Sequence, residues 1–434
     1  MDKKFFSRLA HTLWMTIFTA MFLTASGNAQ AGDAGSIQPW RDNSCVFWEY
    51  DGKPMMLIGA SDDDNLLQWN GDALIEHLDL IKSMGGNYVR NTMSDRSEGN
   101  IFAVKQLDNG RYDLEQWNEA YWDQLTFFLD ETAKRGIIVH LTLSDWFDLS
   151  GDDVYGRFAV HPLNPENNIN WEAGAIENAW DYYGGSLEDE NQKALDYQHR
   201  YVDRLMSISA RYNHIIYNIG NESGLDMEWD NYWATDIKKA AKARGKTIHV
   251  TTMRFAPDIS VRRVMSRRDV FSFVDVSQNN QDALGPVGKK HWENLLFWRK
   301  MIAMSDEGPM PINNVKVYGE GVGLNTAAGS EKEAVERFWR NIFGGAASTR
   351  FHRPASATAA PGAGASDFPS ARSKPCAPLI CSWIHLIFTA PNPMKRSQPW
   401  ATRWIPIVWQ ISAKHMQCIF PPAGPRFTWT HGCM

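Results

Sequence analysis

Two glutamates each follow a short apolar run, and this pairing is the feature of the chain that most directly suggests chemistry. Glu222 follows Ile215-Ile216-Tyr217-Asn218-Ile219-Gly220-Asn221, and Glu320 follows Val315-Lys316-Val317-Tyr318-Gly319. Two carboxyl groups at the ends of two buried strands suit paired acid/base catalysis. Glycosidic bonds are cut in this way, because one carboxyl group protonates the leaving oxygen while the other attacks the anomeric carbon or activates water. We therefore expect glycosidic bond hydrolysis.

A helix-then-strand unit recurs between residues 72 and 250. Each amphipathic helix closes on a basic residue, often with glycine, because a cation meets the negative end of the helix dipole and glycine adopts the left-handed cap. The runs that follow are apolar throughout, as strands of a parallel sheet covered by helices must be. Eight strands are predicted, over residues 55–59, 87–89, 137–139, 214–216, 247–250, 271–276, 315–318 and 346–351.

Eight such units predict an α/β fold of the closed (β/α)8 or TIM-barrel type over residues 37–353. The structural alternative is a doubly wound open sheet. No glycine-rich phosphate loop follows the first strand, where Asp62-Asp63-Asp64 stand instead, so nucleotide binding is not expected. The segment 139–215 is much longer than one helix requires. We interpret it as an elaborated loop that roofs the cleft.

The order of the two glutamates resembles the clan of retaining (β/α)8 glycoside hydrolases that includes the cellulase-like families. In that clan, Asn-Glu after strand four supplies the acid/base, and a glutamate after strand seven supplies the nucleophile. The resemblance covers about residues 37–353. It implies that Glu222 is the acid/base, that Glu320 attacks to form a glycosyl-enzyme, and that Asn221 binds the sugar 2-hydroxyl.

Further site residues follow from positions at strand ends, where barrel active sites lie. Arg90 ends the second strand, and it matches the arginine with which the clan holds its nucleophile ionised. Asp145 and Trp146 end the third strand and are predicted to line the cleft, with Trp146 either stacking on a sugar or packing under the long loop. Tyr318 is also predicted to bind substrate. The clan often has His or Tyr after strand six and Trp after strand eight, whereas this chain has Ser277-Gln278-Asn279-Asn280 and Phe351-His352-Arg353 there.

The first 31 residues read as a secretory signal peptide. Lys3, Lys4 and Arg8 precede an apolar stretch over residues 13–23, and Ala29-Gln30-Ala31 forms a small-residue cleavage site. The apolar stretch is shorter than a membrane span. We expect a secreted or periplasmic protein with no membrane contact after cleavage, the alternative being a retained N-terminal anchor.

The composition changes abruptly after Arg353. Of the 50 acidic residues only Asp367 lies beyond that point, while the same 81 residues contain 12 of the 20 prolines and four of the five cysteines. No helical or alternating periodicity is visible there. We interpret residues 354–434 as a frameshifted or disordered tail, the alternative being a genuine proline-rich, disulfide-bearing segment. No function is assigned to it.

The composition also indicates which binding partners are to be expected. The net charge of −6 argues against nucleic acid, which requires clustered Lys and Arg, and the 19 tryptophans suit flat, hydroxyl-rimmed ligands such as sugars. We expect a monomer that acts on a polysaccharide or oligosaccharide with no organic cofactor and no metal. Calcium at Asp62-Asp63-Asp64 or at residues 148–153 is the alternative for metal. The functional alternatives are a non-catalytic carbohydrate-binding barrel, an inactivated enzyme, and a polysaccharide lyase.

Overall fold

The computed structural model describes residues 35–44, 47–69, 71–95, 99–149, 157–187, 191–222, 224, 227–254, 257–278, 289–317 and 331–352. The predicted signal peptide 1–31, the predicted tail 354–434 and two predicted site residues, Tyr318 and Glu320, lie outside these ranges. Their roles therefore stay predictions.

Eight parallel strands form one nearly closed barrel. In spatial order they run β10-β9-β8-β5-β4-β13-β12-β11, and every pairing between neighbours is parallel. The last strand pairs with the first, with Ser348 beside Leu57 and Phe351 beside Ala60. The short strands β10 and β11 lie at the two ends of this order. The bounds are β4 Leu57–Ala60, β5 Tyr88–Thr92, β8 Ile138–Asp145, β9 Ile215–Asn221, β10 Val250–Thr251, β11 Val274–Asp275, β12 Ile312–Val317 and β13 Ser348–Phe351.

The predicted (β/α)8 barrel is thus confirmed, and the doubly wound alternative is wrong because an open sheet would not pair its first strand with its last. All eight predicted strands are present, although their bounds differ. Met55, assigned to the first strand, instead belongs to the antiparallel strand β3 (Lys53–Met55).

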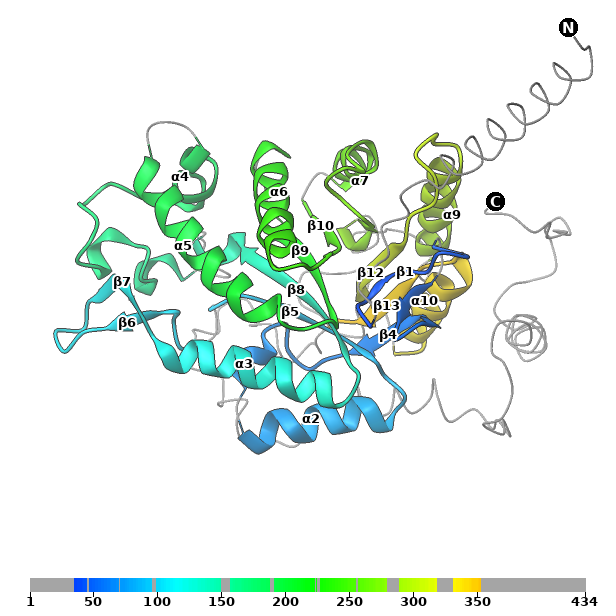
Figure 1. The fold of residues 1–434 in the computed structure, drawn as a ribbon, viewed down its shortest axis with the longest axis horizontal. Helices are drawn as coiled ribbons and strands as arrows, with labels where there is room; N and C mark the ends of the chain where they lie inside the picture. The colour runs from blue at the N-terminus through cyan, green and yellow to red at the C-terminus, as the bar shows by residue number, and fades with distance from the viewer. Residues whose placement is uncertain are drawn as a thin grey trace, which may run out of the picture. The chain divides into compact units, whose positions relative to one another are not determined.

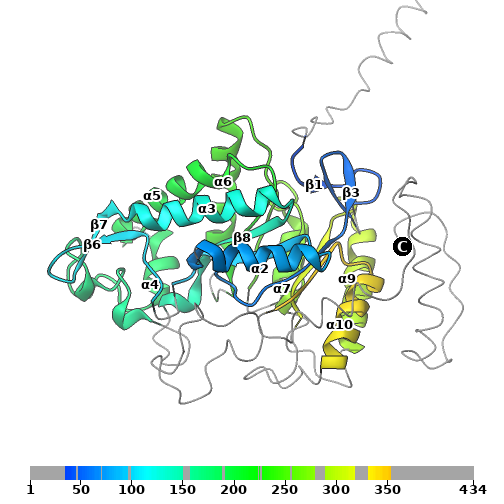
Figure 2. The same cartoon turned by 90° about the horizontal axis from the view of Figure 1, so that it is seen from below.

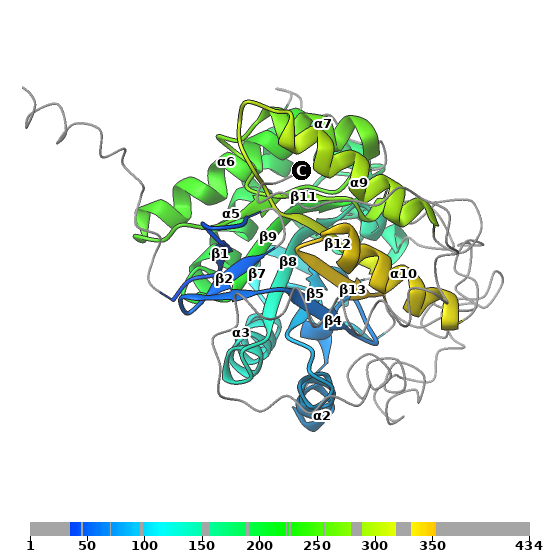
Figure 3. The same cartoon turned by 90° about the vertical axis from the view of Figure 1, so that its right-hand side faces the viewer.

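In the described parts of the chain, helices lie around the strands, which Figure 3 shows at the centre. They are α2 Gly71–Ser83, α3 Glu119–Lys134, α5 Gln192–Ser209, α6 Met227–Ala243, α7 Pro257–Ser266, α9 Lys289–Ala303 and α10 Glu331–Gly344. The helical spacing of apolar residues explains their packing: α3 buries Tyr121, Leu125 and Phe128 on one face. Gly85 and Gly136, just after α2 and α3, have φ of 85° and 60°, the left-handed conformation predicted for the helix caps. None of the helices in the described ranges has the length and apolarity needed to cross a bilayer.

The barrel interior contains a cluster of apolar side chains, most of which lie at or near the amino-terminal ends of the strands. Its members come from all eight strands or the residues beside them: Leu57, Tyr88, Ile138, Ile216, Met253, Phe273, Val315 and Ala347. Ile37 and Trp48 complete this cluster from outside the barrel. Trp48 lies on β2 (Trp48–Tyr50), which forms a small antiparallel sheet with β1 (Gln38–Pro39) and β3. This sheet therefore closes one end of the barrel. A second, larger cluster joins apolar residues of the strands, such as Val89 and Leu141, to apolar residues of the helices, such as Leu78 and Phe128.

The opposite end of the barrel, where the strands have their carboxyl ends, carries most of the elements added to the eight strands and their helices. A hairpin of β6 (Val104–Gln106) and β7 (Tyr112–Trp117) lies there, together with α4 (Ala179–Tyr183), far from β1 in both Figure 1 and Figure 2. The long segment after β8 contributes α4 and short 3-10 turns before α5 begins. The predicted elaboration of this segment is therefore present, whereas its position over a cleft stays a prediction. Tyr183 of α4 donates a hydrogen bond to the backbone oxygen of Asp145, 3.2 Å away.

Candidate active site

Glu222 lies immediately after β9, at the carboxyl end of the fourth barrel strand. Its side chain is buried, with the residue 8% exposed, and its backbone adopts φ of +53°, a conformation that side-chain-bearing residues rarely hold. Such local strain persists where the surroundings determine it and is typical of functional sites. Oε1 accepts a hydrogen bond from Nε2 of Gln278 at 2.8 Å and forms an ion pair with Nζ of Lys316. Oε2 has no hydrogen bond to any described residue.

Asn221, the neighbour of Glu222, is fixed by hydrogen bonds on both sides of its amide. Its Oδ1 accepts from NH2 of Arg90 at 2.7 Å and from Nζ of Lys316 at 3.2 Å. Its Nδ2 donates to Oδ1 of Asp145 at 2.9 Å. These contacts determine which end of the amide is oxygen and which is nitrogen. Four predicted site residues, Arg90, Asp145, Asn221 and Glu222, are thus brought together at one end of the barrel.

Asp64 organises the cations next to this group. Its carboxylate forms an ion pair with Arg350 at 3.2 Å and lies 3.1 Å from Nδ1 of His352. The same carboxylate lies 3.8 Å from NH1 of Arg90. Burial opposes ionisation of Asp64, but His352, Arg90 and Arg350 together outweigh burial and hold its pKa well below the ordinary value. Asp64 therefore compensates buried positive charge.

The acidic run that contains Asp64 was one candidate for calcium. In the structure its carboxylates contact protein donors: Asp63 accepts from the indole of Trp69 at 3.0 Å, and Asp62 lies 3.8 Å from His77. Across the described ranges, no three His, Cys, Asp or Glu side chains group in a way that would hold a metal ion. The second calcium candidate, residues 148–153, lies mostly outside those ranges.

Trp146 begins the turn after β8 (Trp146–Leu149), and its ring stacks on that of Tyr183 with centroids 6.0 Å apart. The side chain is only partly buried. Packing against the long loop, one of the two interpretations offered by the sequence, is therefore present, and sugar stacking stays a prediction. Tyr318 and Glu320, outside the described residues, follow directly after β12.

Lys316, Gln278 and Asp64 contact the predicted site residues, but the sequence does not predict them as part of the site. Lys316 stands within an apolar run, and a charge inside such a run is itself a signal of an internal partner. In the sequence, Gln278 stands out only as part of a departure from the clan's pattern. It follows β11 and reaches Glu222 across the barrel mouth.

One further buried carboxyl group lies at this end of the barrel. Asp275, on β11, has its pKa raised to about 6 because burial disfavours the charge, although Ser277 partly offsets this through hydrogen bonds. Its Oδ1 accepts from the backbone N–H of Ser277 at 2.8 Å. Oδ2 has no partner among the described residues. Asp275 is therefore neutral over part of the acidic range in which an ordinary aspartate is charged.

The fold places buried carboxylates and their hydrogen-bonding partners at the carboxyl ends of the barrel strands. Enzymes with this fold have their active sites at that end. No protein-family model matches the chain, and no curated protein matches it either. Solved structures do. A glycoside hydrolase family 5 mannosidase from Rhizomucor miehei aligns at 13% identity over 73% of this chain and 85% of that chain, with a TM-score of 0.51.

Two other similar structures are an endo-β-1,4-mannanase from Thermotoga petrophila and a glycoside hydrolase family 5 protein from Bacteroides vulgatus. The first is 13% identical, covers 80% of this chain and 79% of its own, and has a TM-score of 0.49. The second is also 13% identical, with a TM-score of 0.47, and the match spans 74% of this chain but only 62% of that chain. The likeness to the Rhizomucor mannosidase confirms, at the level of the fold, the predicted resemblance to barrel-shaped glycoside hydrolases.

Proposed function

We propose that this protein is a glycoside hydrolase that cleaves O-glycosidic bonds in a polysaccharide or oligosaccharide. The observation that carries the proposal is the state of Glu222: a buried carboxylate at the end of the fourth strand, with one oxygen held by Gln278 and Lys316 and the other without a hydrogen bond to the described residues. The barrel shared with a family 5 mannosidase supports the same class.

We further propose a retaining, double-displacement mechanism. Glu222 donates a proton to the glycosidic oxygen while the carboxylate of Glu320 attacks the anomeric carbon, so that the carbon–oxygen bond to the leaving group breaks as the glycosyl-enzyme bond forms. Water then attacks the anomeric carbon and gives a proton to Glu222. The bond between the sugar and Glu320 breaks in this step, so that Glu320 is again a free carboxylate. Asn221, whose amide is fixed by Arg90 and Asp145, hydrogen-bonds the sugar 2-hydroxyl. This chemistry requires about 5 to 5.5 Å between the two carboxyl groups.

Hydrolysis of a panel of soluble glycans, including mannans, glucans and xylans, tests the activity. Glu222→Gln and Glu320→Gln should each lower kcat by at least about a hundredfold, because each removes a group that acts in the transition state. Glu119→Gln is the matched control: Glu119 is an exposed carboxylate that pairs with Arg204 on the helix surface. Nuclear magnetic resonance of the first-formed anomer distinguishes retention from inversion.

Other outcomes identify the alternatives. Sugar binding without hydrolysis in the parent would favour a carbohydrate-binding barrel or an inactivated enzyme. Products that absorb in the ultraviolet would indicate a lyase, because elimination leaves a double bond and hydrolysis does not. Full activity in both glutamine variants would contradict the proposed roles of the two glutamates.

We also propose that the protein is exported, to the periplasm or beyond, and loses residues 1–31. Support comes from the basic, apolar and small-residue segments in that order. Intact-mass measurement of the protein from its native host should give a chain that begins at Gly32. A mass that includes residues 1–31 would contradict cleavage.

A further inference from the structure

Lys316 is a buried cation inside the barrel. It lies on β12, is only 2% exposed, and contacts two residues at the end of β9: it pairs with Oε1 of Glu222 and donates to Oδ1 of Asn221 at 3.2 Å. An ammonium group removed from water is costly unless it is paired, so this pairing accounts for its presence there. Lys316 thus links the strand that leads to Glu320 with the strand that ends at Glu222.

Both donors to Glu222 converge on the same oxygen. Gln278 donates its amide N–H to Oε1, which is also the atom that Lys316 contacts. A lysine ammonium and an amide nitrogen are donors only, so the oxygen between them acts as an acceptor and is not the one that carries a proton. When Glu222 is protonated, the proton must therefore reside on Oε2, the oxygen without a hydrogen bond to the described residues.

We propose that Lys316 is a positioning residue for Glu222, which holds Oε1 as an acceptor and so places the transferable proton on Oε2. The inference rests on the proposed acid/base role of Glu222 and deepens it. Lys316 itself does not touch the reacting atoms. Its positive charge also favours the carboxylate of Glu222 over the acid, so the acid form required for the first step is lost at a lower pH than it would be without Lys316.

Other charged residues lie at this end of the barrel. In the described ranges they come from every neighbouring strand or the residues after it: Asp64 after β4, Arg90 on β5, Asp145 on β8, Arg254 after β10, Asp275 on β11, and Arg350 and His352 at β13. Most of them are already paired, Asp64 with the arginines and Arg254 with Asp230. Glu320 lies outside the described residues. Lys316 is the described cation that contacts Glu222 directly.

The test is the pH profile of kcat/KM for Lys316→Met. Loss of the cation should move the alkaline limb, where the acid form of Glu222 is lost, to higher pH by about one unit or more. At the parent's optimum, kcat should fall at least about tenfold because Glu222 is less firmly oriented. Lys316→Arg keeps the charge and should leave the limb near that of the parent. Lys246→Met is the control, since Lys246 pairs with Asn213 far from the site.

An alkaline limb that stays in place in Lys316→Met would overturn the proposal, even if kcat falls, because a purely structural role lowers activity without moving the limb. If that variant does not fold, Lys316→Gln, which keeps a donor but loses the charge, should show the same shift.

A double-mutant cycle tests the contact without any activity. Thermal unfolding of Lys316→Met, Glu222→Gln and the double variant should show strongly non-additive changes in Tm, since the two side chains touch. Additive changes would overturn the contact and with it the proposal. A parent that hydrolyses no glycan, or a Glu222→Gln variant with full activity, would instead refute the proposed function. The two failures are therefore distinguishable.

Discussion

Arg90 donates a hydrogen bond to Oδ1 of Asn221 across 2.7 Å, from the second barrel strand to the fourth. Both side chains are buried, and the strand between them, β8, contributes Asp145 to the other side of the same amide. Among the described residues Arg90 is therefore a partner of Asn221 and Asp64. Its contact with Glu320, the proposed nucleophile, stays a prediction, because Glu320 lies outside those residues.

The amide of Asn221 should depend on Asp145. In Asp145→Ala, Nδ2 of Asn221 loses its acceptor, which we expect to cost about 1 to 3 kcal/mol of folding free energy. The freed amide can then rotate, so kcat/KM should fall by about a hundredfold. Asp145→Asn retains an acceptor oxygen and should stay within a few-fold of the parent. Denaturant unfolding and steady-state kinetics of both variants measure this contrast. Equal losses in the two would show that charge, not the hydrogen bond, matters.

Asp64 should be among the carboxylates most important for stability. Asp64→Asn leaves Arg90, Arg350 and His352 without their shared anion, and breaking a buried pair of this kind costs about 3 to 5 kcal/mol. Urea unfolding at pH 7 measures the loss. Asp79→Asn is the control, because Asp79 pairs with Arg135 on the exposed helix surface. A loss no larger than that of the control would contradict the assigned role.

The same carboxylate predicts a pH dependence. Its pKa in the folded protein lies well below the ordinary 3.8, so the folded state binds fewer protons than the unfolded state in acid. The stabilisation is complete above about pH 4 and is lost as the pH falls towards the folded pKa. The parent should therefore lose stability steeply below pH 4, while Asp64→Asn should show a shallower decline. Parallel curves for the two proteins would refute this origin of the acid sensitivity.

The arrangement of the barrel and four of the site residues could be predicted from the sequence. Continuous apolar runs identify strands of a parallel sheet, and in a barrel the carboxyl ends of all strands meet at one face, so Arg90, Asp145, Asn221 and Glu222 had to converge. Lys316 could not be oriented in this way. The pairing of β12 with β13 shifts register between Asn314 and Val317, and such an irregularity changes which side chains point inward.

Gln278 and Asp64 were missed for a different reason. Both lie beyond strand ends, where the path of the chain is set by tertiary contacts and leaves no period in the sequence. The sequence suggests calcium for the acidic run that contains Asp64. Its actual partners, Arg350 and His352, cannot be anticipated because they are almost 290 residues away along the chain. Long-range charge compensation of this kind has no local signature.

Asp275 should lower stability at neutral pH. Its folded pKa of about 6 exceeds the ordinary 3.8, so the folded state binds more protons than the unfolded state between these values. Stability is therefore full below about pH 4 and declines as the pH rises through 6. Asp275→Asn mimics the neutral acid and should be more stable than the parent by about 2 to 3 kcal/mol at pH 8, with no difference at pH 4.

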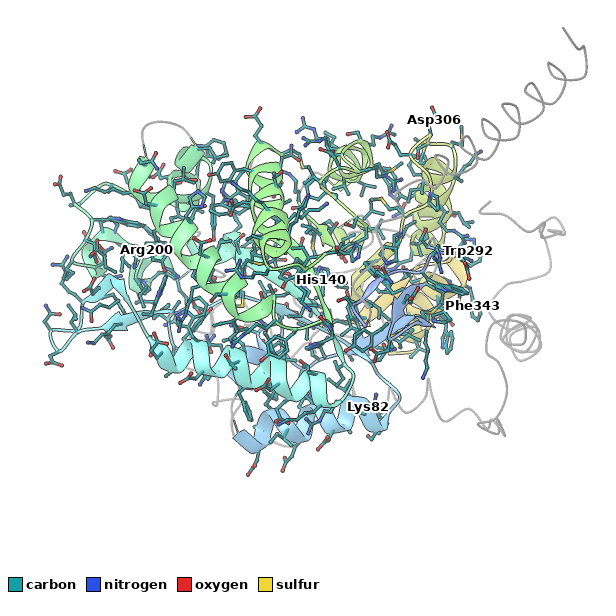
Figure 4. The ribbon with its side chains drawn as sticks, viewed as in Figure 1. Lys82, His140, Arg200, Trp292, Asp306 and Phe343 are labelled. Atoms are coloured by element: carbon teal, nitrogen blue, oxygen red, sulfur yellow. The ribbon has the colours of Figure 1, made fainter. Side chains whose placement is uncertain are left out.

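Thermal or urea unfolding at both pH values measures this effect. Asp306→Asn serves as the control because Asp306 is exposed at the periphery of the molecule (Figure 4). A difference between Asp275→Asn and the parent that does not grow with pH would indicate that the substitution acts through packing instead of charge.

Trp48 should matter for stability without affecting the proposed chemistry. Its indole is fully buried, donates to Oδ1 of Asn313 at 3.2 Å, and packs edge-on against Phe273 with centroids 5.1 Å apart. Trp48→Ala empties this space at the amino-terminal ends of the strands and should cost about 3 to 5 kcal/mol. Trp180→Ala, at a tryptophan that is 48% exposed, is the matched control.

The carboxyl ends of the strands, where Glu222 lies, are at the opposite end of the barrel from Trp48. Activity per folded molecule in Trp48→Ala should therefore equal that of the parent at temperatures well below its lowered Tm. Unfolding measurements give the loss of stability, and kcat measured on the folded fraction gives the activity per folded molecule. A fall in kcat of tenfold or more at full folding would show that the two ends of the barrel are coupled, and would contradict the separation between the layer that closes the barrel and the site above it.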